Sequence, residues 1–168
     1  MSDARILIVD DHEDNLFALE STLAPLGCRM ERASSGDQAL KAVLRGGLQL
    51  VLLDVVMPQV SGLDVVRYMN RLEQTQDIPV ILLTGLGHDI GLAVTAHDLG
   101  VADFIVKPID PWLLRTKVRY LLRVQERLRH LEGQLLALRS DTAAQHEHHV
   151  PEQRPRVCRP RRPEETPT

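Results

Sequence analysis

Residues 48–58 read LQLVLLDVVMP, an almost continuous apolar run that leads directly into Asp54. Similar short aliphatic runs lie at residues 5–9, 79–83 and 104–106, and a weaker one lies at residues 28–32. The runs at 79–83 and 104–106 lack alternating polar residues, which is typical of strands that helices cover on both faces. Between the runs, apolar residues recur at helical spacing in residues 16–26, 39–44, 63–72 and 90–99. This alternation predicts an α/β fold, a doubly wound five-stranded parallel sheet with the βα unit repeated five times.

Polar residues follow the predicted strands at the points where the strands end. These residues are Asp10, Asp11, Asp54, Thr84 and Lys107. In a parallel sheet these ends meet at one edge, where functional groups gather. Three carboxylates brought together would repel one another, and a hard cation such as Mg²⁺ with oxygen ligands removes that conflict. A lysine ammonium and a threonine hydroxyl suit the oxygens of a phosphate group.

The ordered set of motifs resembles the signature of two-component response regulator receiver domains over roughly residues 4–122. The motifs are Asp10-Asp11, DVVMP at 54–58 with Gly62, Thr84-Gly85 and Lys107-Pro108. The resemblance implies that Asp54 accepts a phosphoryl group from a sensor histidine kinase or a phosphotransfer protein. It also implies a Mg²⁺ site made by Asp11, Asp54 and the backbone carbonyl of Val56, with Asp10 acting mostly through water. Lys107 would pair with the phosphoryl group, beside a cis Lys107–Pro108 peptide.

The resemblance further implies a switch made by two residues. Thr84 would move toward the phosphoryl group, and Phe104 would rotate into the space that it leaves. Two plainer interpretations stand beside this one, because Thr84 is also typical of a turn and Phe104 of an apolar edge strand. Val56 and Leu86 are apolar and flank the path of the hydrolytic water in the family, so slow autodephosphorylation is expected. Apart from this chemistry on itself, the protein is not expected to be an enzyme.

The last helix is predicted to begin at Pro111 after an N-cap at Asp110, and to remain helical to about Arg139. One polar and seven apolar residues recur along it at alternating three- and four-residue spacing: Leu114, Lys117, Leu121, Val124, Leu128, Leu131, Leu135 and Leu138. This heptad pattern predicts a coiled coil and a homodimer, with docking on another protein or a linker to a lost domain as alternatives. The predicted organisation is a receiver domain at 1–122, a helical extension at 123–139 and a disordered tail at 140–168.

Charge is distributed unevenly along the chain. Residues 1–110 carry 8 Lys/Arg and 16 Asp/Glu, residues 111–139 carry 7 and 2, and residues 140–168 carry 5 and 5. The basic helix makes an acidic protein partner credible, whereas the balanced tail does not favour binding to nucleic acid. Cys28 and Cys158 lie in unrelated contexts, so no disulfide framework is predicted. With no leader or bilayer-length apolar run, a cytoplasmic protein without a membrane partner is expected.

Together these features predict a phosphorylation-dependent signalling switch. It would act through contacts with a downstream protein target, without a DNA-binding output domain. One alternative is the N-terminal receiver module of a larger regulatory protein whose effector domain is lost or absent. Another is an aspartyl-phosphate phosphohydrolase of the haloacid dehalogenase type, but that chemistry uses a second acid two residues after the nucleophile, where Val56 stands. The last is a passive dimerisation module, against which the full set of pocket residues argues.

Overall fold

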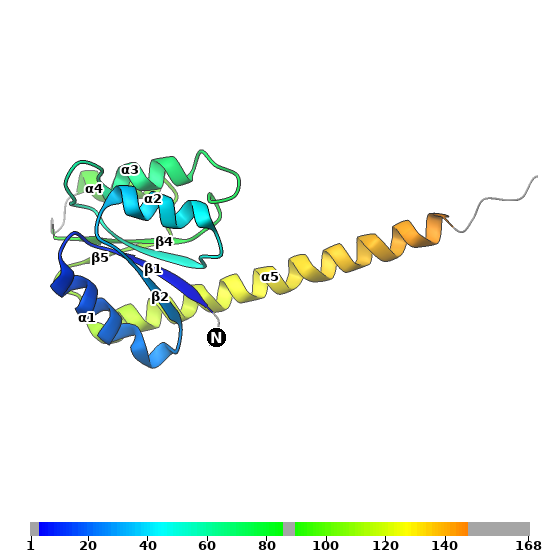
Figure 1. Ribbon diagram of the computed structural model, residues 1–168, viewed down its shortest axis with the longest axis horizontal. Coiled ribbons are helices and arrows are strands. Elements are labelled where there is room, and N and C mark those ends of the chain that lie inside the picture. The colour runs from blue at the N-terminus through cyan, green and yellow to red at the C-terminus, as the bar shows by residue number, and fades with distance from the viewer. Residues whose placement is uncertain (1–3, 86–89, 148–168) are drawn as a thin grey trace, which may run out of the picture. The chain divides into compact units, whose positions relative to one another are not determined.

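The computed structural model describes residues 4–85 and 90–147, with side chains for residues 4–85 and 91–139. The chain divides into two units, Met1–Arg129 and His130–Thr168. The first unit holds a five-stranded parallel sheet in the order β2-β1-β3-β4-β5, which confirms the predicted doubly wound fold (Figure 1). Its strands are β1 Arg5–Val9, β2 Arg29–Ala33, β3 Leu50–Asp54, β4 Val80–Thr84 and β5 Asp103–Val106.

Helices cover both faces of this sheet. They are α1 Glu13–Leu23, extended by the short 3-10 helix η1 Ala24–Leu26, α2 Gly36–Arg45, α3 Gly62–Met69, α4 Ile90–Asp98 and α5 Pro111–Glu147. Successive residues of a strand point to opposite faces, so β1 contributes to two cores. Leu7 and Val9 pack with residues of α2, α3 and α4. Ile6 and Ile8 pack with residues of α1 and with the part of α5 that belongs to the first unit.

Two helices end at places that differ from the predicted ones. The third helix ends at Met69 although its apolar spacing continues to Leu72. The Met69 carbonyl instead accepts hydrogen bonds from the Leu72 amide at 3.2 Å and from the buried Thr75 hydroxyl at 2.7 Å, which close a tighter turn. The last helix continues past Arg139 to Glu147. Residues 148–168 of the predicted tail lie outside the described residues.

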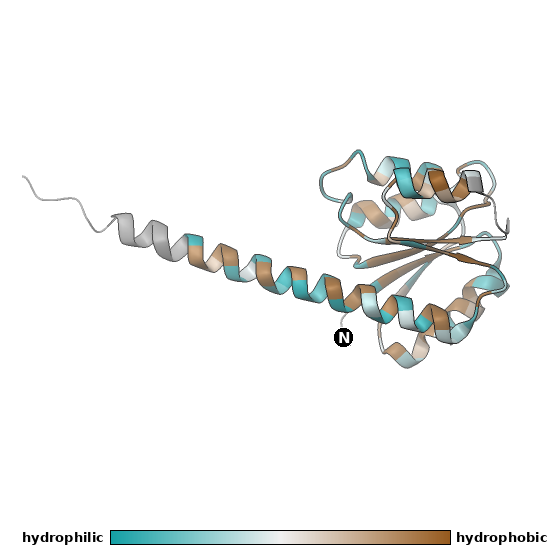
Figure 2. Cartoon of the chain, turned by 180° about the vertical axis from the view of Figure 1, so that it is seen from behind, coloured by the Kyte–Doolittle hydropathy of each residue, from teal (hydrophilic) through white to brown (hydrophobic). Residues whose placement is uncertain are grey.

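The start of α5 is built as the sequence indicates. The Asp110 carboxylate accepts a hydrogen bond of 2.7 Å from the Leu113 amide, and Pro111 occupies the first helical position, where no amide hydrogen is required. Apolar residues recur along the part of this helix whose side chains are described (Figure 2). Among the described residues, no helix combines the length and the apolar character needed to cross a membrane.

Candidate functional site

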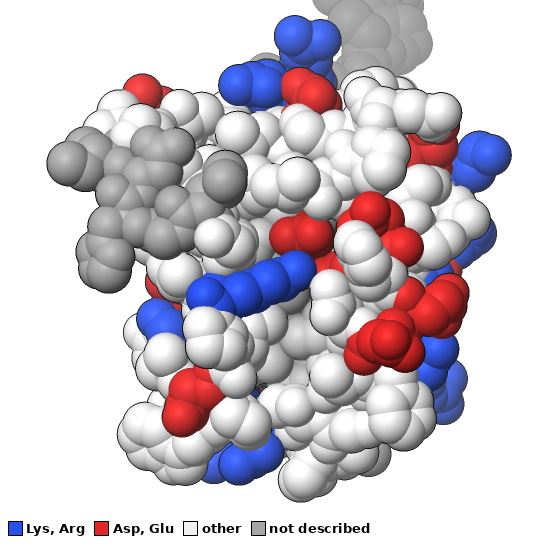
Figure 3. All heavy atoms as spheres, turned by 90° about the vertical axis from the view of Figure 1, so that its left-hand side faces the viewer, with Lys and Arg blue, Asp and Glu red and all other residues white. Residues whose placement is uncertain are grey.

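The carboxyl ends of the three central strands and of β5 bring the predicted polar residues to one edge of the sheet. Asp10 follows β1, Asp54 and Thr84 are the last residues of β3 and β4, and Lys107 follows β5. The parallel register aligns these ends, because Asp54 lies opposite Leu83 and Thr84 lies opposite Val106. A view of this side of the molecule shows acidic side chains gathered at the end of a basic one (Figure 3). The edge is therefore a polar cluster on top of an apolar sheet.

Lys107 joins two of the carboxylates. Its Nζ lies 2.9 Å from Asp10 Oδ2 and 3.2 Å from Asp54 Oδ1. Asp10 is completely buried, and Asp54 is only 5% exposed. One ammonium group thus forms ion pairs with two carboxylates that have little access to water. The cluster of Lys107, Asp10 and Asp54 therefore carries more negative than positive charge.

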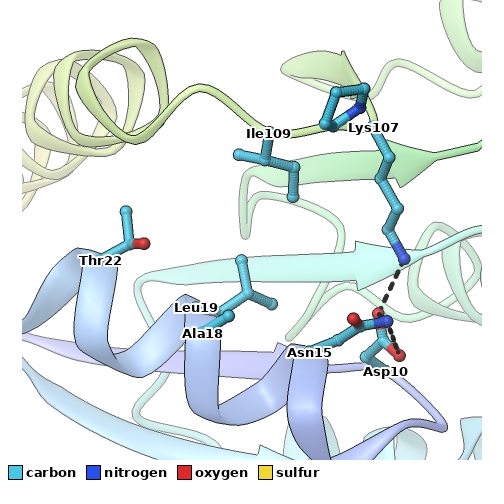
Figure 4. A pocket seen from close by; sticks show the side chains of 8 residues that line it. Asp10, Asn15, Ala18, Leu19, Thr22, Lys107 and Ile109 are labelled. Carbon is cyan, nitrogen blue, oxygen red and sulfur yellow. Dashed lines mark hydrogen bonds and ion pairs between the residues drawn. The ribbon is translucent and has the colours of Figure 1, made fainter.

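Asp10 has further partners that the sequence interpretation missed. Asn15 Nδ2 lies 2.9 and 3.0 Å from the two carboxylate oxygens of Asp10, and the His12 amide donates to Oδ1 at 3.0 Å. Figure 4 shows Asn15 and Lys107 converging on Asp10 from α1 and from the residues after β5. The position of Asn15 in the first turn of α1, five residues after Asp10, is a weak signal that the sequence alone offered.

These partners give the two buried carboxyl groups opposite pKa shifts. Burial opposes the charged form of Asp10, but hydrogen bonds from Lys107, Asn15 and the His12 amide outweigh it and hold the Asp10 pKa below its usual value. Burial and repulsion from Asp10 raise the pKa of Asp54, and the attraction to Lys107 is too weak to offset them. The Lys107 pKa is raised because the two carboxylates outweigh its own burial. Lys107 therefore stays charged, and Asp54 is the carboxylate that lacks compensation.

The residues after β1 also form the one group of acidic and histidine ligands found close together in the described part of the chain. Ligand atoms of Asp10, Asp11 and His12 all lie within 4.8 Å of one another. Asp11 is partly exposed, and its Oδ1 lies 2.9 Å from His12 Nδ1. Carboxylate oxygens at this edge suit a hard divalent cation, and the uncompensated charge of Asp54 provides a reason for one to bind.

The loop between β3 and α3 packs closely against the backbone of Asp54. A Cβ atom on Gly62 would lie 2.2 Å from the Asp54 carbonyl oxygen and 3.0 Å from the Val55 Cα, so only glycine fits there. The Gly62 amide donates to the Val55 carbonyl at 3.1 Å. Gln59 has φ of 67°, a left-handed conformation that is costly for a residue with a side chain. The loop therefore turns back tightly against the backbone of Asp54 and Val55.

The other predicted site residues lie around this cluster. Thr84 is buried, and its carbonyl accepts a hydrogen bond of 2.7 Å from the Lys107 amide, which ties β4 to the end of β5. The Lys107–Pro108 peptide is cis, as predicted. Phe104 is 43% exposed on β5, so its side chain is not part of the core. Val56 is also exposed, and Leu86 lies outside the described residues.

A cavity of about 250 Å³ lies beside the Lys107–Asp10 pair (Figure 4). Its walls come from α1 and from the residues that join β5 to α5: Asp10, Asn15, Ala18, Leu19, Thr22, Lys107, Pro108 and Ile109. Asp10, Asn15 and Lys107 lie at one end of the cavity, and Thr22 lies at the other end (Figure 4).

Comparison with known proteins gives a consistent result. Residues 6–119 match the profile of the response regulator receiver domain. The chain is 38% identical over 122 residues to the probable transcriptional regulator ycf27 of Cyanophora paradoxa, which covers 73% of this chain and 49% of that protein. It is 37% identical over 118 residues to a probable cyclic di-GMP phosphodiesterase of Vibrio cholerae, covering 70% of this chain and 26% of that protein.

Solved structures agree. The signal receiver domain of a putative Luxo repressor protein from Vibrio parahaemolyticus has a TM-score of 0.73 at 27% identity, with 78% of this chain and 98% of that chain covered. A CheY-like response regulator receiver domain protein from Methanospirillum hungatei has a TM-score of 0.68 at 26% identity, covering 74% and 98%. The chain spans about half the length of the first curated relatives that it matches, 49%, 50% and 46% of three of them.

Proposed function

This chain belongs to the response regulator receiver domain family, and from that premise we propose that Asp54 is the phosphoacceptor of a phosphorylation switch in a two-component system. The phosphoryl donor is a sensor histidine kinase or a phosphotransfer protein. The observation that carries the proposal is the position of the Lys107 ammonium, 2.9 Å from Asp10 and 3.2 Å from Asp54. It places a fixed positive charge beside a buried carboxylate at the edge where a parallel sheet concentrates its functional groups.

The proposed reaction is the transfer of a phosphoryl group from a histidine nitrogen to Asp54. A carboxylate oxygen of Asp54 forms the new phosphorus–oxygen bond as the phosphorus–nitrogen bond breaks, and the imidazole leaves with the electron pair. Phosphoryl transfer has a loose transition state, so positioning and charge stabilisation supply most of the catalysis. Lys107 is suited to both tasks, because its raised pKa keeps it charged beside Asp54.

Receiver domains bind Mg²⁺ in an acidic pocket, and the residues here fit that ion. Asp11, Asp54 and the Val56 carbonyl would hold it, with Asp10 acting mostly through water. The fit is supported by the oxygen donors beside β1 and by the raised pKa of Asp54, which marks an uncompensated negative charge. When bound, the ion neutralises charge on the phosphoryl oxygens. In its absence, Lys107 is the cation in direct contact with both Asp10 and Asp54.

The phosphorylated state is proposed to be read through Thr84 and Phe104. A phosphoryl group adds a charge of about −1.5 to −2 at Asp54. This charge attracts the Thr84 hydroxyl from the end of the neighbouring strand, and Phe104 then turns inward from its exposed position on β5. Because Val56 and Leu86 are apolar, water attack is slow and the phosphorylated state is long-lived.

We propose that the phosphorylated protein acts by binding another protein. A downstream protein target would bind the receiver domain, residues 1–122, in its phosphorylated form, in the cytoplasm and without a DNA-binding output domain. The helical extension at 123–139 is proposed to join two copies of the chain.

A small phosphodonor tests the phosphoacceptor directly. Incubation with acetyl phosphate and Mg²⁺ should produce one phosphoryl adduct per chain by intact-mass spectrometry, and Asp54→Asn should abolish it. Asp98→Asn, which removes an exposed carboxylate at the end of α4, is the matched control and should keep the adduct. An adduct that persists in Asp54→Asn, or continuous release of phosphate from an ester substrate, would contradict the proposal.

A second candidate is an N-terminal receiver module of a larger regulatory protein. The observation that favours it is the length of the relatives, of which this chain spans about half, and several of which are named transcriptional regulators. In that case α5 would lead to an effector domain. The intact mass of the protein isolated from its source cells separates the two candidates, because a mass near 18.9 kDa excludes an appended domain.

A further inference from the structure

The C-terminal half of α5 carries large apolar side chains that are exposed to solvent. Val124 is 37% exposed, and the exposed fraction is 47% for Leu128, 41% for Leu131 and 56% for Leu135. A helix gains little stability from backbone propensity alone, and most of it comes from packing an apolar face. Gly133 lies within this stretch and lowers the helix propensity further. We therefore expect another apolar surface to pack against this exposed face of α5.

The spacing of this face matches a two-stranded coiled coil. With Leu121, Leu128 and Leu135 at the first position of each heptad, Val124, Leu131 and Leu138 fall at the fourth, so every position of the apolar seam is filled. Gly133 falls at the outermost position, and its Cα faces open space. The residues that flank the seam are Gln125, Arg127, Glu132, Gln134 and Arg139. Polar flanks keep the seam narrow, which favours two helices over larger bundles.

We infer that the occupant is a second copy of this chain, whose α5 runs parallel and in register along the seam from Val124 to Leu138. This inference rests on the proposed self-association and adds its direction and register. In a parallel pair, Arg127 of one copy lies beside Glu132 of the second copy, and the reverse pair forms on the other side. Neither residue has an ion-pair partner among the described side chains of its own chain.

Charge distinguishes this arrangement from an antiparallel one. In an antiparallel pair each flanking position faces the same position of the second copy, so Arg127 would face Arg127 or Gln134 and no acid. The parallel arrangement instead gives Arg127 of each copy an acidic partner, Glu132 of the other copy. Arg119, Arg123 and Arg129 lie off the seam, so the strong positive charge of α5 remains on its outer surface.

Two adjacent leucines provide a matched test of the seam. Leu135 lies on it, whereas Leu136 lies off it, and the two are similarly exposed at 56% and 66%. In sedimentation of the full-length chain, Leu135→Gln should raise the dimer dissociation constant by about tenfold or more, and Leu136→Gln should change it by less than about twofold. A chain that is monomeric at all concentrations, or equal effects of the two substitutions, would overturn the seam.

The direction is tested by cross-linking. In a Cys28→Ser, Cys158→Ser background, Leu138→Cys should form a disulfide-linked dimer under mild oxidation, whereas Leu136→Cys should not. Mixing the Val124→Cys and Leu135→Cys chains should give only the two homodimers, since the first and fourth heptad positions share a layer only in an antiparallel pair. Arg127→Glu and Glu132→Arg should each weaken association, and the double variant should restore it. A mixed disulfide, or no restoration, would refute the parallel register.

All of these measurements use unphosphorylated protein. Asp54→Asn, which removes the phosphoacceptor, should leave both the dissociation constant and the cross-linking pattern unchanged. A failure of the coiled coil is thus separable from a failure of the switch, because each has its own readout.

Discussion

Replacing Lys107 with methionine tests the electrostatics of the site most directly. Methionine keeps much of the side-chain length and removes the charge. At about 3 Å and an effective dielectric constant of about 20, one ion pair contributes roughly 5 kcal/mol of gross attraction, and Lys107 makes two such contacts, with Asp10 and Asp54. Most of this attraction is offset because the variant no longer buries an ammonium.

The net effect follows from what remains around Asp10. Removing one partner of a buried ion pair typically costs about 3–5 kcal/mol. Here Asn15 and the His12 amide still bind Asp10, and the Lys107 side chain is 27% exposed, so water can take part of its place. We expect Lys107→Met to lower the free energy of unfolding by about 2–3 kcal/mol at pH 7 in EDTA. Lys41→Met, on the exposed face of α2, should change it by less than about 0.5 kcal/mol.

Mg²⁺ should recover about half of this loss. With the competing ammonium gone, the variant should bind Mg²⁺ about tenfold more tightly than the wild type, which corresponds to about 1.4 kcal/mol. Urea denaturation followed by circular dichroism, with EDTA and with saturating Mg²⁺, measures both quantities. If the variant is as stable as the wild type in EDTA, or if Mg²⁺ stabilises both proteins equally, the ammonium does not compensate these carboxylates and the reasoning fails.

The pH dependence of the same variant has a definite sign. Because the Asp10 pKa is lowered in the folded protein, its contribution to stability is present above its unfolded value near 3.8 and is lost as the pH falls through the lower folded value. Lys107→Met removes part of this contribution. The difference in stability between the variant and the wild type should therefore be complete at pH 7 and should shrink below about pH 4.

Three further changes test other parts of the site. Gly62→Ala should lower the free energy of unfolding by about 3 kcal/mol, because its Cβ would meet the Asp54 backbone at 2.2 Å. Gly85→Ala is the control, because a Cβ there has open space and should change the free energy of unfolding little. Equal effects of the two substitutions in urea denaturation would contradict the close approach at Gly62. Asp54→Asn should raise stability in EDTA, because burial and repulsion from Asp10 raise the pKa of Asp54 and its charge therefore opposes folding. This gain should be complete above the folded pKa and absent below about pH 4, and a variant less stable than the wild type at pH 7 would show the reverse sign. Gln59→Gly should stabilise the folded protein by about 0.5–1 kcal/mol, because glycine adopts the left-handed conformation at this position without strain. A lower thermal midpoint of the variant would show that the Gln59 side chain stabilises the fold by more than its backbone conformation costs.

Much of the site could be predicted from the sequence because its chemistry is local to strand ends. Each apolar run is followed directly by its polar residue, and the parallel topology brings these ends together without further information. The sequence therefore predicts Asp10, Asp54, Thr84 and Lys107 at one edge, and the structure brings all four there. The ends of the helices were less predictable, since the apolar spacing of the third helix continues to Leu72 after its backbone has turned at Met69.

Only the tertiary structure distinguished the electrostatic environments of the two buried carboxylates. In the sequence, Asp10 and Asp54 are both acids at the end of an apolar strand. In the fold, Asp10 receives hydrogen bonds from Lys107, Asn15 and the His12 amide, whereas Asp54 has Lys107 and the repulsion of Asp10, so their pKa values shift in opposite directions. The exposure of Phe104 on β5 was likewise decided by packing. Sequence order determined which groups meet, and three-dimensional burial determined which of them remains uncompensated, because desolvation depends on neighbours that lie far apart in the chain.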